Sequence, residues 1–383
     1  MLRKGDLTQG GITGTLLHFT LPMMVGSFLQ QCYNIADTLI VGQCIGAGAL
    51  AAVGSAYTLM VFLISVLLGL AMGSGTVFSL HYGAGNHVAL RRSIFSSFVL
   101  IGIVTLILNV AVFIWLGPIL RLLQVPQDIY GMMRSYLWII FCGIVFTFIY
   151  NFYASLLRAV GDSVTPLWFL AVSVVLNIAL DLFFILQLDW GIQGAASATV
   201  LAQGVAALGI IIYTYRRRPE LRWHHEDMCF DRTCLKEIAS FSTLTCIQQS
   251  VMNLGILMVQ GLVNSFGTVV MAAFAAAVKI DAFAYMPVQD FGNAFSTFIA
   301  QNYGAKEKKR IQQGLKAAVR ISAIFCVVVS TFVYIFSKPL MMIFVDAKET
   351  AIIMEGVRYL RIEGAFYIGI GWLFLLYGLY RAL

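Results

Sequence analysis

The stretch YNIADTLIVG, residues 33–42, places an aspartate inside an apolar segment with a helical period. The composition of the whole chain decides which solvent surrounds that segment. Of the 383 residues, 60% are hydrophobic and only 11% are charged, and the mean hydropathy is +0.86. A water-soluble globular chain of this size carries far more charge on its surface. The sequence therefore predicts an integral membrane protein in which Asp37 lies at membrane depth.

Apolar runs of about 20 residues, each long enough to cross roughly 30 Å of hydrocarbon as a helix, alternate with short polar joints. These runs contain Gly and Pro and show no ten-residue alternation, which excludes an outer-membrane barrel. We predict an all-α, polytopic membrane helix bundle whose first span is too long for a signal peptide and stays as an anchor. Ten spans are expected, at residues 16–41, 47–79, 93–116, 132–157, 166–187, 193–215, 236–264, 268–300, 313–336 and 353–380.

Lys and Arg are distributed unevenly over the joints. Of the 25 such residues, 18 lie in the amino terminus or in the joints that follow the even-numbered spans. Because positively charged joints stay in the cytoplasm, we expect an inner-membrane protein with both termini inside the cell. The RRR run at 216–218 fits this topology signal, so no nucleic-acid partner is expected.

In HHEDMCFDRTC, the spacing of His224, His225, Cys229 and Cys234 matches no standard zinc site and favours a polar linker.

A repeat organises the chain. HYGAG at 81–85 and NYGAK at 302–306 follow the second span of each half, and the same offset of 221 residues pairs Gly46 with Gly267. Six spans separate the two copies, so both enter the membrane in the same direction, as parallel repeats related by an axis along the membrane normal. The sequence therefore predicts a two-lobed bundle.

The predicted lobes are residues 1–215 with six helices and residues 236–383 with four, joined by a basic cytoplasmic linker at 216–235. FYASLLRAV at 152–160 resembles LLYGLYRAL at 375–383, and only the first half continues through two further spans. By the logic of the repeat, a complete second copy needs about two more helices, so we expect the second repeat to be incomplete.

Polar residues inside the spans are the candidate site. A carboxylate facing lipid costs several kcal/mol, so Asp37 and Asp181 are expected to face the protein interior or a wet cavity. At 1.5 Å per residue, Asp37 lies about 21 residues and Asp181 about 15 residues from the cytoplasmic ends of their spans. Tyr136 and Thr199 reach the same depth from the other side. Asn177 precedes Asp181 by four residues and shares its helical face.

Several motifs occur in order along the chain: LPMMV with Pro22, YNIADTLIVGQCIGAGALAAVG, LLRAVGDSVTP, LNIALDLFFI and FIAQNYGAKEKKRI. Together they resemble the MATE family of multidrug and toxin extrusion transporters, in particular its prokaryotic DinF-like branch. The resemblance implies a secondary antiporter that exports cationic or amphipathic compounds against protons or sodium. It also implies that the first span bends at Pro22 and that the cation and proton site consists of Asp37, Asn177, Asp181, Tyr136 and Thr199.

The two acids suggest how ion and cargo are coupled. Adjacent carboxylates in a poorly solvated cavity are costly to ionise together, so one of them is expected to exchange a proton. Protonation would remove the charge that attracts a cationic drug and let the first span bend at Pro22. If both acids stay ionised, Asp37, Asn177, Asp181 and Thr199 offer an all-oxygen site for sodium. We favour protons, and expect no further cofactor or metal.

The second half differs in chemistry, since Asp37 falls on Met258 at the repeat offset. Lys279 and Asp281 are two residues apart and point to different helix faces, so they are not expected to pair with each other. Lys279 is equally consistent with a polar cavity wall and with a structural tie between the lobes. We expect the substrate cavity to include Tyr33, Asn34, Lys279, Asp281, Gln289 and Asn293.

Three other functional classes compete with an exporter. A flippase of lipid-linked precursors favours a cavity rich in Arg and Lys, whereas only Lys279 is intramembrane here. An enzyme would need a constellation such as HExxH or GxSxG, which the sequence lacks. A purely structural role remains the third alternative. The prediction is therefore a non-enzymatic, monomeric exporter whose partners are small cationic or amphipathic drugs and membrane lipid.

Overall fold

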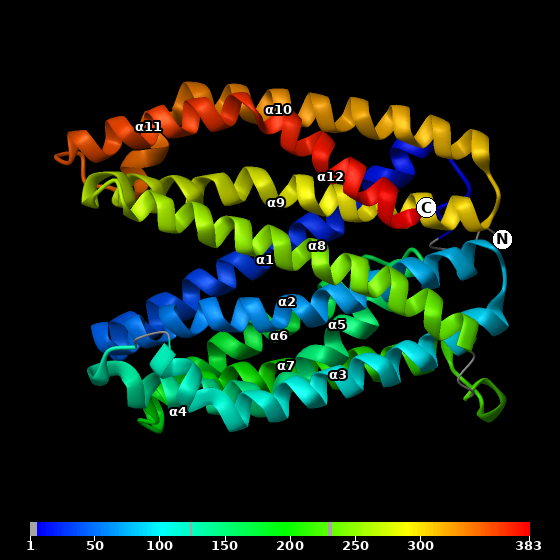
Figure 1. Ribbon diagram of the computed structural model, residues 1–383, viewed down its shortest axis with the longest axis horizontal. Helices are drawn as coiled ribbons and strands as arrows, with labels where there is room; N and C mark the ends of the chain where they lie inside the picture. Colours follow the sequence, from blue (N-terminus) through cyan, green and yellow to red (C-terminus); the bar gives the residue numbers. More distant parts are fainter. Residues whose placement is uncertain (1–5, 123–124, 229–231) are drawn as a thin grey trace. The chain divides into compact units, whose positions relative to one another are not determined.

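The computed structural model describes residues 6–122, 125–228 and 232–383 (Figure 1). These residues form helices and connecting turns and contain no strand, which confirms the all-α class. The elements are α1 (Ile12–Cys44), α2 (Ala47–Gly83), α3 (His87–Leu122), α4 (Gln127–Cys142), α5 (Ile144–Ala159), α6 (Val164–Leu182), the π-helix η1 (Phe183–Gln187), α7 (Gly191–Arg217), the 3₁₀ turns η2 (Pro219–Leu221) and η3 (His225–Asp227), α8 (Arg232–Asn264), α9 (Thr268–Gly304), α10 (Lys308–Phe344), α11 (Thr350–Ala365) and α12 (Tyr367–Ala382).

Among the described residues, seven helices are long and apolar enough to cross a membrane, and the number reaches nine if each of two bent pairs is one span. The bent pairs are α4 with α5, at 48°, and α11 with α12, at 49°. This number of nine candidate spans among the described residues is one fewer than the ten spans expected from the sequence. Helix α8 has 33 residues but is not among the candidates. Its polar side chains, among them Lys236, Glu237, Gln248 and Gln249, lower its apolarity below that of the other spans.

The first bent pair breaks at Gly143, where α7 approaches closely. A Cβ atom at this position would lie 2.6 Å from Cγ2 of Val200. Glycine therefore allows the bend and the contact at one place, because it carries no side chain. The second pair breaks at Phe366, at the corresponding position in the second half.

The helix boundaries confirm the repeat. Helices α2 and α9 each have 37 residues and begin after Gly46 and Gly267, whose φ angles are 115° and 93°. Both helices lead into a turn with a left-handed residue, Gly85 at φ 67° and Lys306 at φ 59°. Glycine adopts positive φ without strain, so three of these four positions suit their residue and only Lys306 is strained.

By their contacts, the described residues form two compact units. Unit 1 contains residues 29–250, and unit 2 contains residues 6–28 and 251–383. The first helix of each repeat, α1 or α8, therefore contributes to both units. The lobes predicted from the sequence follow the repeat instead, and their boundaries stay a prediction.

Unit 2 holds the segment that precedes α1. The guanidinium of Arg310 donates to the backbone carbonyls of Leu7, Gln9 and Gly10 at 2.7–3.2 Å. The Nδ2 of Asn302 also donates to the Leu7 carbonyl, at 3.3 Å. The repeated motif NYGAK at 302–306, together with the basic segment that follows it, thus anchors the start of the first helix.

Unit 1 holds the beginning of α8 in a corresponding way. His81, which matches Asn302 in the repeat, lies 3.5 Å from Glu237. Further along, the hydroxyl groups of Ser74 and Ser242 are 3.2 Å apart. A Cβ atom on Gly73 would lie 2.7 Å from the carbonyl oxygen of the residue before Ser242. Small residues therefore let the two backbones approach, as is common between membrane helices.

In Figure 1 the long helices α9 and α10 (yellow and orange) lie side by side, with α12 (red) against α9. The contact between α9 and α12 is close because Gly292 and Gly378 face it: a Cβ atom on Gly292 would lie 2.7 Å from the Phe374 carbonyl oxygen. In unit 1 the core contains an aromatic group in which Phe152 packs edge-on against Phe78 and Phe98. The cores fix the helices that carry the polar residues described next.

Candidate functional site

An acid pair lies inside unit 1. Asp37 on α1 is 8% exposed and Asp181 on α6 is fully buried, and their carboxyl groups lie next to each other. Within the described residues, both Asp181 oxygens and Oδ1 of Asp37 have no hydrogen-bond partner. Burying unpaired negative charge is costly, so a proton or a small cation would stabilise this arrangement.

Three polar side chains surround the acid pair. The Thr199 hydroxyl on α7 donates to the carbonyl oxygen of Ala195 at 3.1 Å. The hydroxyl oxygen of Thr199 also accepts a hydrogen bond from Nδ2 of Asn177 at 3.3 Å and lies 3.3 Å from the hydroxyl oxygen of Tyr33. The amide nitrogen of Asn177 is thus hydrogen-bonded, whereas its buried Oδ1 has no hydrogen-bond partner within the described residues. The amide oxygen is therefore free to face a cation.

Tyr136 on α4 completes the cluster. It is 4% exposed and interacts electrostatically with Asp37, Asp181 and Tyr33. The structure thus brings together the five residues Asp37, Tyr136, Asn177, Asp181 and Thr199, which come from four helices. Their role in ion binding stays a prediction.

The helix that carries Asp181 has local features that position it. Asp162 stabilises the start of α6, since its carboxylate accepts from the backbone N–H and the hydroxyl of Thr165 at 3.0 and 2.8 Å. Asn177 and Asp181 then fall on one face, four residues apart. Immediately after Asp181 and Leu182 the helix widens into the π-helix Phe183–Gln187. Such segments are rare and occur often at functional sites; the sequence analysis did not predict this one.

Two predicted residues on α1 lie outside the acid cluster. Asn34 donates from Nδ2 to Oε1 of Gln31, at 3.1 Å, on its own helix. Pro22, in the part of α1 that belongs to unit 2, lies within a continuous helix. It removes one helical N–H, which weakens the helix near the His18 carbonyl. That weakness is compatible with a bend, and the hinge role of Pro22 stays a prediction.

The predicted cavity residues of unit 2 are not gathered in one place by any contact that the structure shows. Lys279 is exposed, and its Nζ lies 5.9 Å from the ring centroid of Phe344. Asn293 accepts a hydrogen bond from Nη1 of Arg381 at 3.0 Å. Gln289 is half-buried on α9. Lys279 and Asp281 form no ion pair, as the helical spacing predicted.

Asp281 instead belongs to a second acid cluster that the sequence analysis missed. It interacts with Glu363 on α11 and with Tyr367 on α12, and Tyr359 contacts Glu363. A signal for this cluster was present, since Glu363 is a carboxylate inside the predicted span 353–380. The repeat offset could not reveal it, because the first half has no acid at the matching position.

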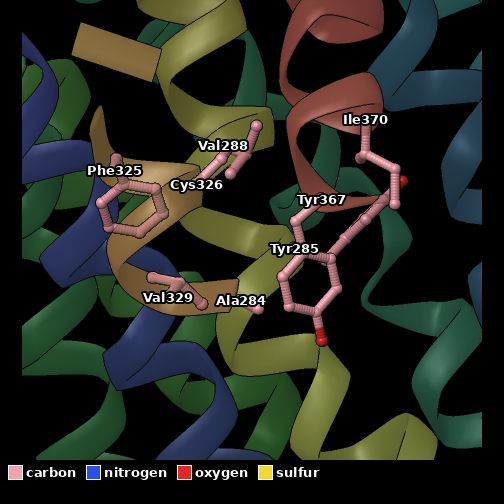
Figure 2. A pocket seen from close by; sticks show the side chains of 8 residues that line it. All are labelled: Ala284, Tyr285, Val288, Phe325, Cys326, Val329, Tyr367 and Ile370. Atoms are coloured by element: carbon pink, nitrogen blue, oxygen red, sulfur yellow. The ribbon is translucent and has the colours of Figure 1, made fainter. Parts of the chain in front are cut away.

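A small apolar cavity lies beside this second cluster. Figure 2 shows Phe325 and Val329 on α10 facing Tyr285 and Tyr367, with Cys326 behind them. Tyr285 stands one turn after Asp281 on α9, so the cavity adjoins the acids. Its walls are otherwise hydrocarbon, which gives the acids of unit 2 a drier surrounding than a surface carboxylate has.

Comparison with known proteins places the chain among membrane transporters. A family model described as MatE matches residues 22–183 and 244–383. The probable multidrug resistance protein YpnP of Bacillus subtilis is 32% identical over all of this chain and 85% of its own length. A second Bacillus subtilis protein, the probable multidrug resistance protein YoeA, is 28% identical over 94% of this chain and 77% of its own length.

A solved structure shows the same fold. The MATE transporter VcmN of Vibrio cholerae superposes with a TM-score of 0.91 at 24% identity, covering 97% of this chain and 84% of its own. The arrangement of helices described above is therefore that of a known transporter fold.

Proposed function

Because this chain belongs to the MatE family, we propose that it is a secondary active multidrug efflux antiporter that exports cationic or amphipathic compounds in exchange for protons. Sodium is the alternative coupling ion. The names of the relatives support multidrug export, and the apolar helices support a multi-pass membrane protein. We further propose that it acts as a monomer in the inner membrane with both termini in the cytoplasm, without enzymatic activity or a cofactor beyond the coupling ion.

The buried acid pair carries the proposal. Asp37 and Asp181 place two carboxyl groups together with three oxygens that have no hydrogen-bond partner among the described residues. In the proposed cycle, the ionised pair attracts a cationic compound, and protonation cancels that attraction and releases it outward. Exchange follows because proton and cargo compete for the same negative charge.

The neighbouring residues orient the pair. The Thr199 hydroxyl fixes the Asn177 amide, whose oxygen then faces away from Thr199. With sodium as the coupling ion, this oxygen and the two carboxylates would supply the hard oxygen ligands that such a cation prefers. With protons, the same groups would stabilise whichever carboxyl group keeps its hydrogen.

Vesicle transport tests the proposal. Purified protein in sealed vesicles is given an imposed proton gradient or an imposed sodium gradient, and movement of the fluorescent cation ethidium is recorded. We expect the proton gradient to drive ethidium, and Asp37→Asn or Asp181→Asn to abolish the driven movement; a response to the sodium gradient alone would favour the alternative ion. Asp128→Asn, at an exposed acid in the first turn of α4, serves as the matched control and should transport normally. Transport that persists in both acid variants would refute the coupling role.

A further inference from the structure

A groove on unit 1 is unrelated to the acid pair. It has a volume of about 590 Å³ and is lined from three helices and the linker by Phe98, Tyr153, Ile211, Ile212, Tyr215, Arg216 and Trp223. This volume lies in the range of small-molecule sites. All of its walls are hydrocarbon or aromatic except at Arg216, so the groove combines a long apolar surface with one cationic end.

The linker after α7 forms one wall because it is tied down at two points. Its Trp223 ring lies 5.6 Å from the ring of Phe98 and 6.3 Å from that of Tyr215, measured between centroids. Further on, Asp227 accepts a 2.7 Å hydrogen bond from Nε of Arg91 on α3. The segment that the sequence marks only as a polar linker is therefore held against the helix bundle, and Trp223 is fixed as part of the groove.

One wall of the groove belongs to a helix that is expected to contact lipid. Ile212 lies on α7, which is long and apolar enough to span the membrane, and 51% of its side chain is exposed. Arg216 follows four residues later on the same face, near the end of that helix. An apolar wall at acyl-chain depth thus continues directly into a cation at the depth of the headgroups.

The acids around the groove are already paired. Asp227 is bound by Arg91, and Arg218 pairs with both Asp162 and Glu220, at 3.3 and 3.5 Å. In the described part of the chain, no ion pair neutralises the exposed Arg216. Its charge is therefore available to an anion that enters from the membrane.

We propose that this groove binds one anionic glycerophospholipid, with an acyl chain along Phe98, Ile212 and Trp223 and the phosphate at Arg216. The shape and the apolar wall of the groove match a lipid rather than a water-soluble anion, because the wall includes the exposed Ile212 on a helix that can span the membrane. The bound lipid fastens the linker to α3 and α7. This site is separate from the coupling site and does not depend on the transported compound.

Native mass spectrometry tests the site on the whole 383-residue chain in mild detergent, with either phosphatidylglycerol or phosphatidylcholine added. The wild type should retain the anionic lipid roughly fivefold more than the zwitterionic one, which is the contribution expected from one interfacial cation. Arg216→Gln should abolish that preference, and Trp223→Ala should weaken binding of both lipids. Arg217→Gln, at an exposed neighbour that does not line the groove, should behave as the wild type.

Two results would overturn the proposal. One is equal loss of phosphatidylglycerol in the Arg217 and Arg216 variants, which would indicate attraction by the basic segment as a whole. The other is displacement of the lipid by excess inorganic phosphate, which would indicate a simple anion site. Thermal unfolding of each variant without added lipid checks that the fold is retained. A brominated phosphatidylglycerol should quench the fluorescence of the wild type more than that of Trp223→Phe, which would locate the acyl chain beside Trp223; equal quenching of the two would count against the groove.

Discussion

Replacing Thr199 by valine isolates one hydroxyl group beside the acid pair. Valine keeps the shape of the side chain but removes the oxygen that accepts from Asn177 and contacts Tyr33. Asn177 is 2% exposed, so its amide nitrogen would be left buried without that partner. The amide would then turn toward another acceptor, and its oxygen would no longer be held in place near Asp37 and Asp181.

The size of the effect follows from these contacts. An unsatisfied buried donor costs about 1–3 kcal/mol, and a bond of 3.3 Å is a long one, so we expect about 1–2 kcal/mol here. If this energy is lost from ion binding, the half-saturating ion concentration for efflux rises roughly 5- to 30-fold, at 1.4 kcal/mol per factor of ten. The readout is ethidium efflux from vesicles over a range of pH and sodium concentration, together with thermal unfolding.

A matched control lies on the same helix. Thr214 is also buried and donates to the carbonyl four residues earlier, Ile210, at 2.7 Å. Thr214→Val should lower stability without shifting the ion dependence of efflux. Thr199→Ser, which keeps the hydroxyl group, should show the ion dependence of the wild type. The reasoning is refuted if the Thr199 and Thr214 variants show the same ion dependence.

Three further substitutions test other parts of the structure. Gly143→Ala should lower stability by about 1–3 kcal/mol in thermal unfolding, because the new methyl group overlaps Val200. Asp227→Asn should lower the melting temperature at pH 7, and the difference from the wild type should shrink as the pH falls below 3.8. Burial raises the pKa of Asp227, yet the hydrogen bonds from Arg91 and the backbone lower it below 3.8 overall. Stability from a depressed carboxyl pKa is present above the unfolded value and is lost as the pH falls through the folded one. Glu363→Gln should raise stability at neutral pH, because the neutral amide avoids placing a charge in a poorly solvated position and removes the repulsion from Asp281.

Each of these substitutions has a control. Gly131→Ala, on α4 where a Cβ atom meets nothing within 4 Å, should be tolerated. Asp128→Asn, at an exposed acid in the first turn of α4, should leave the melting temperature at pH 7 close to that of the wild type. Glu355→Gln, at an exposed position on α11, should leave stability unchanged. Three results would contradict these contacts. Gly143→Ala could be as stable as the wild type, Asp227→Asn could lower the melting temperature equally at every pH, or Glu363→Gln could lower stability.

The helices and the repeat were predictable because they depend on local signals. Apolar runs of membrane length and the paired glycines at 46 and 267 were enough to place α2 and α9. The break at Gly143 was not, because it depends on the approach of Val200 from a distant helix. The division of α1 between two units also depends on long-range contacts, such as those of Arg310 with the start of the chain.

The candidate site shows the same distinction. Depth along a helix predicted that Asp37, Tyr136, Asp181 and Thr199 share one level, and the structure places them together. The second cluster was missed because the sequence does not reveal that α11 packs against α9, the contact that brings Glu363 close to Asp281. The π-helix after α6 was missed because no residue pattern marks an added residue in a helical turn.

Proton release on drug binding tests the central claim most directly. Purified protein in weakly buffered detergent solution is titrated with ethidium while a pH-sensitive dye records free protons. If the acid pair of Asp37 and Asp181 exchanges a proton for the cation, the wild type releases protons as ethidium binds, and Asp37→Asn with Asp181→Asn releases none. Equal proton release by the wild type and the double variant would contradict the account.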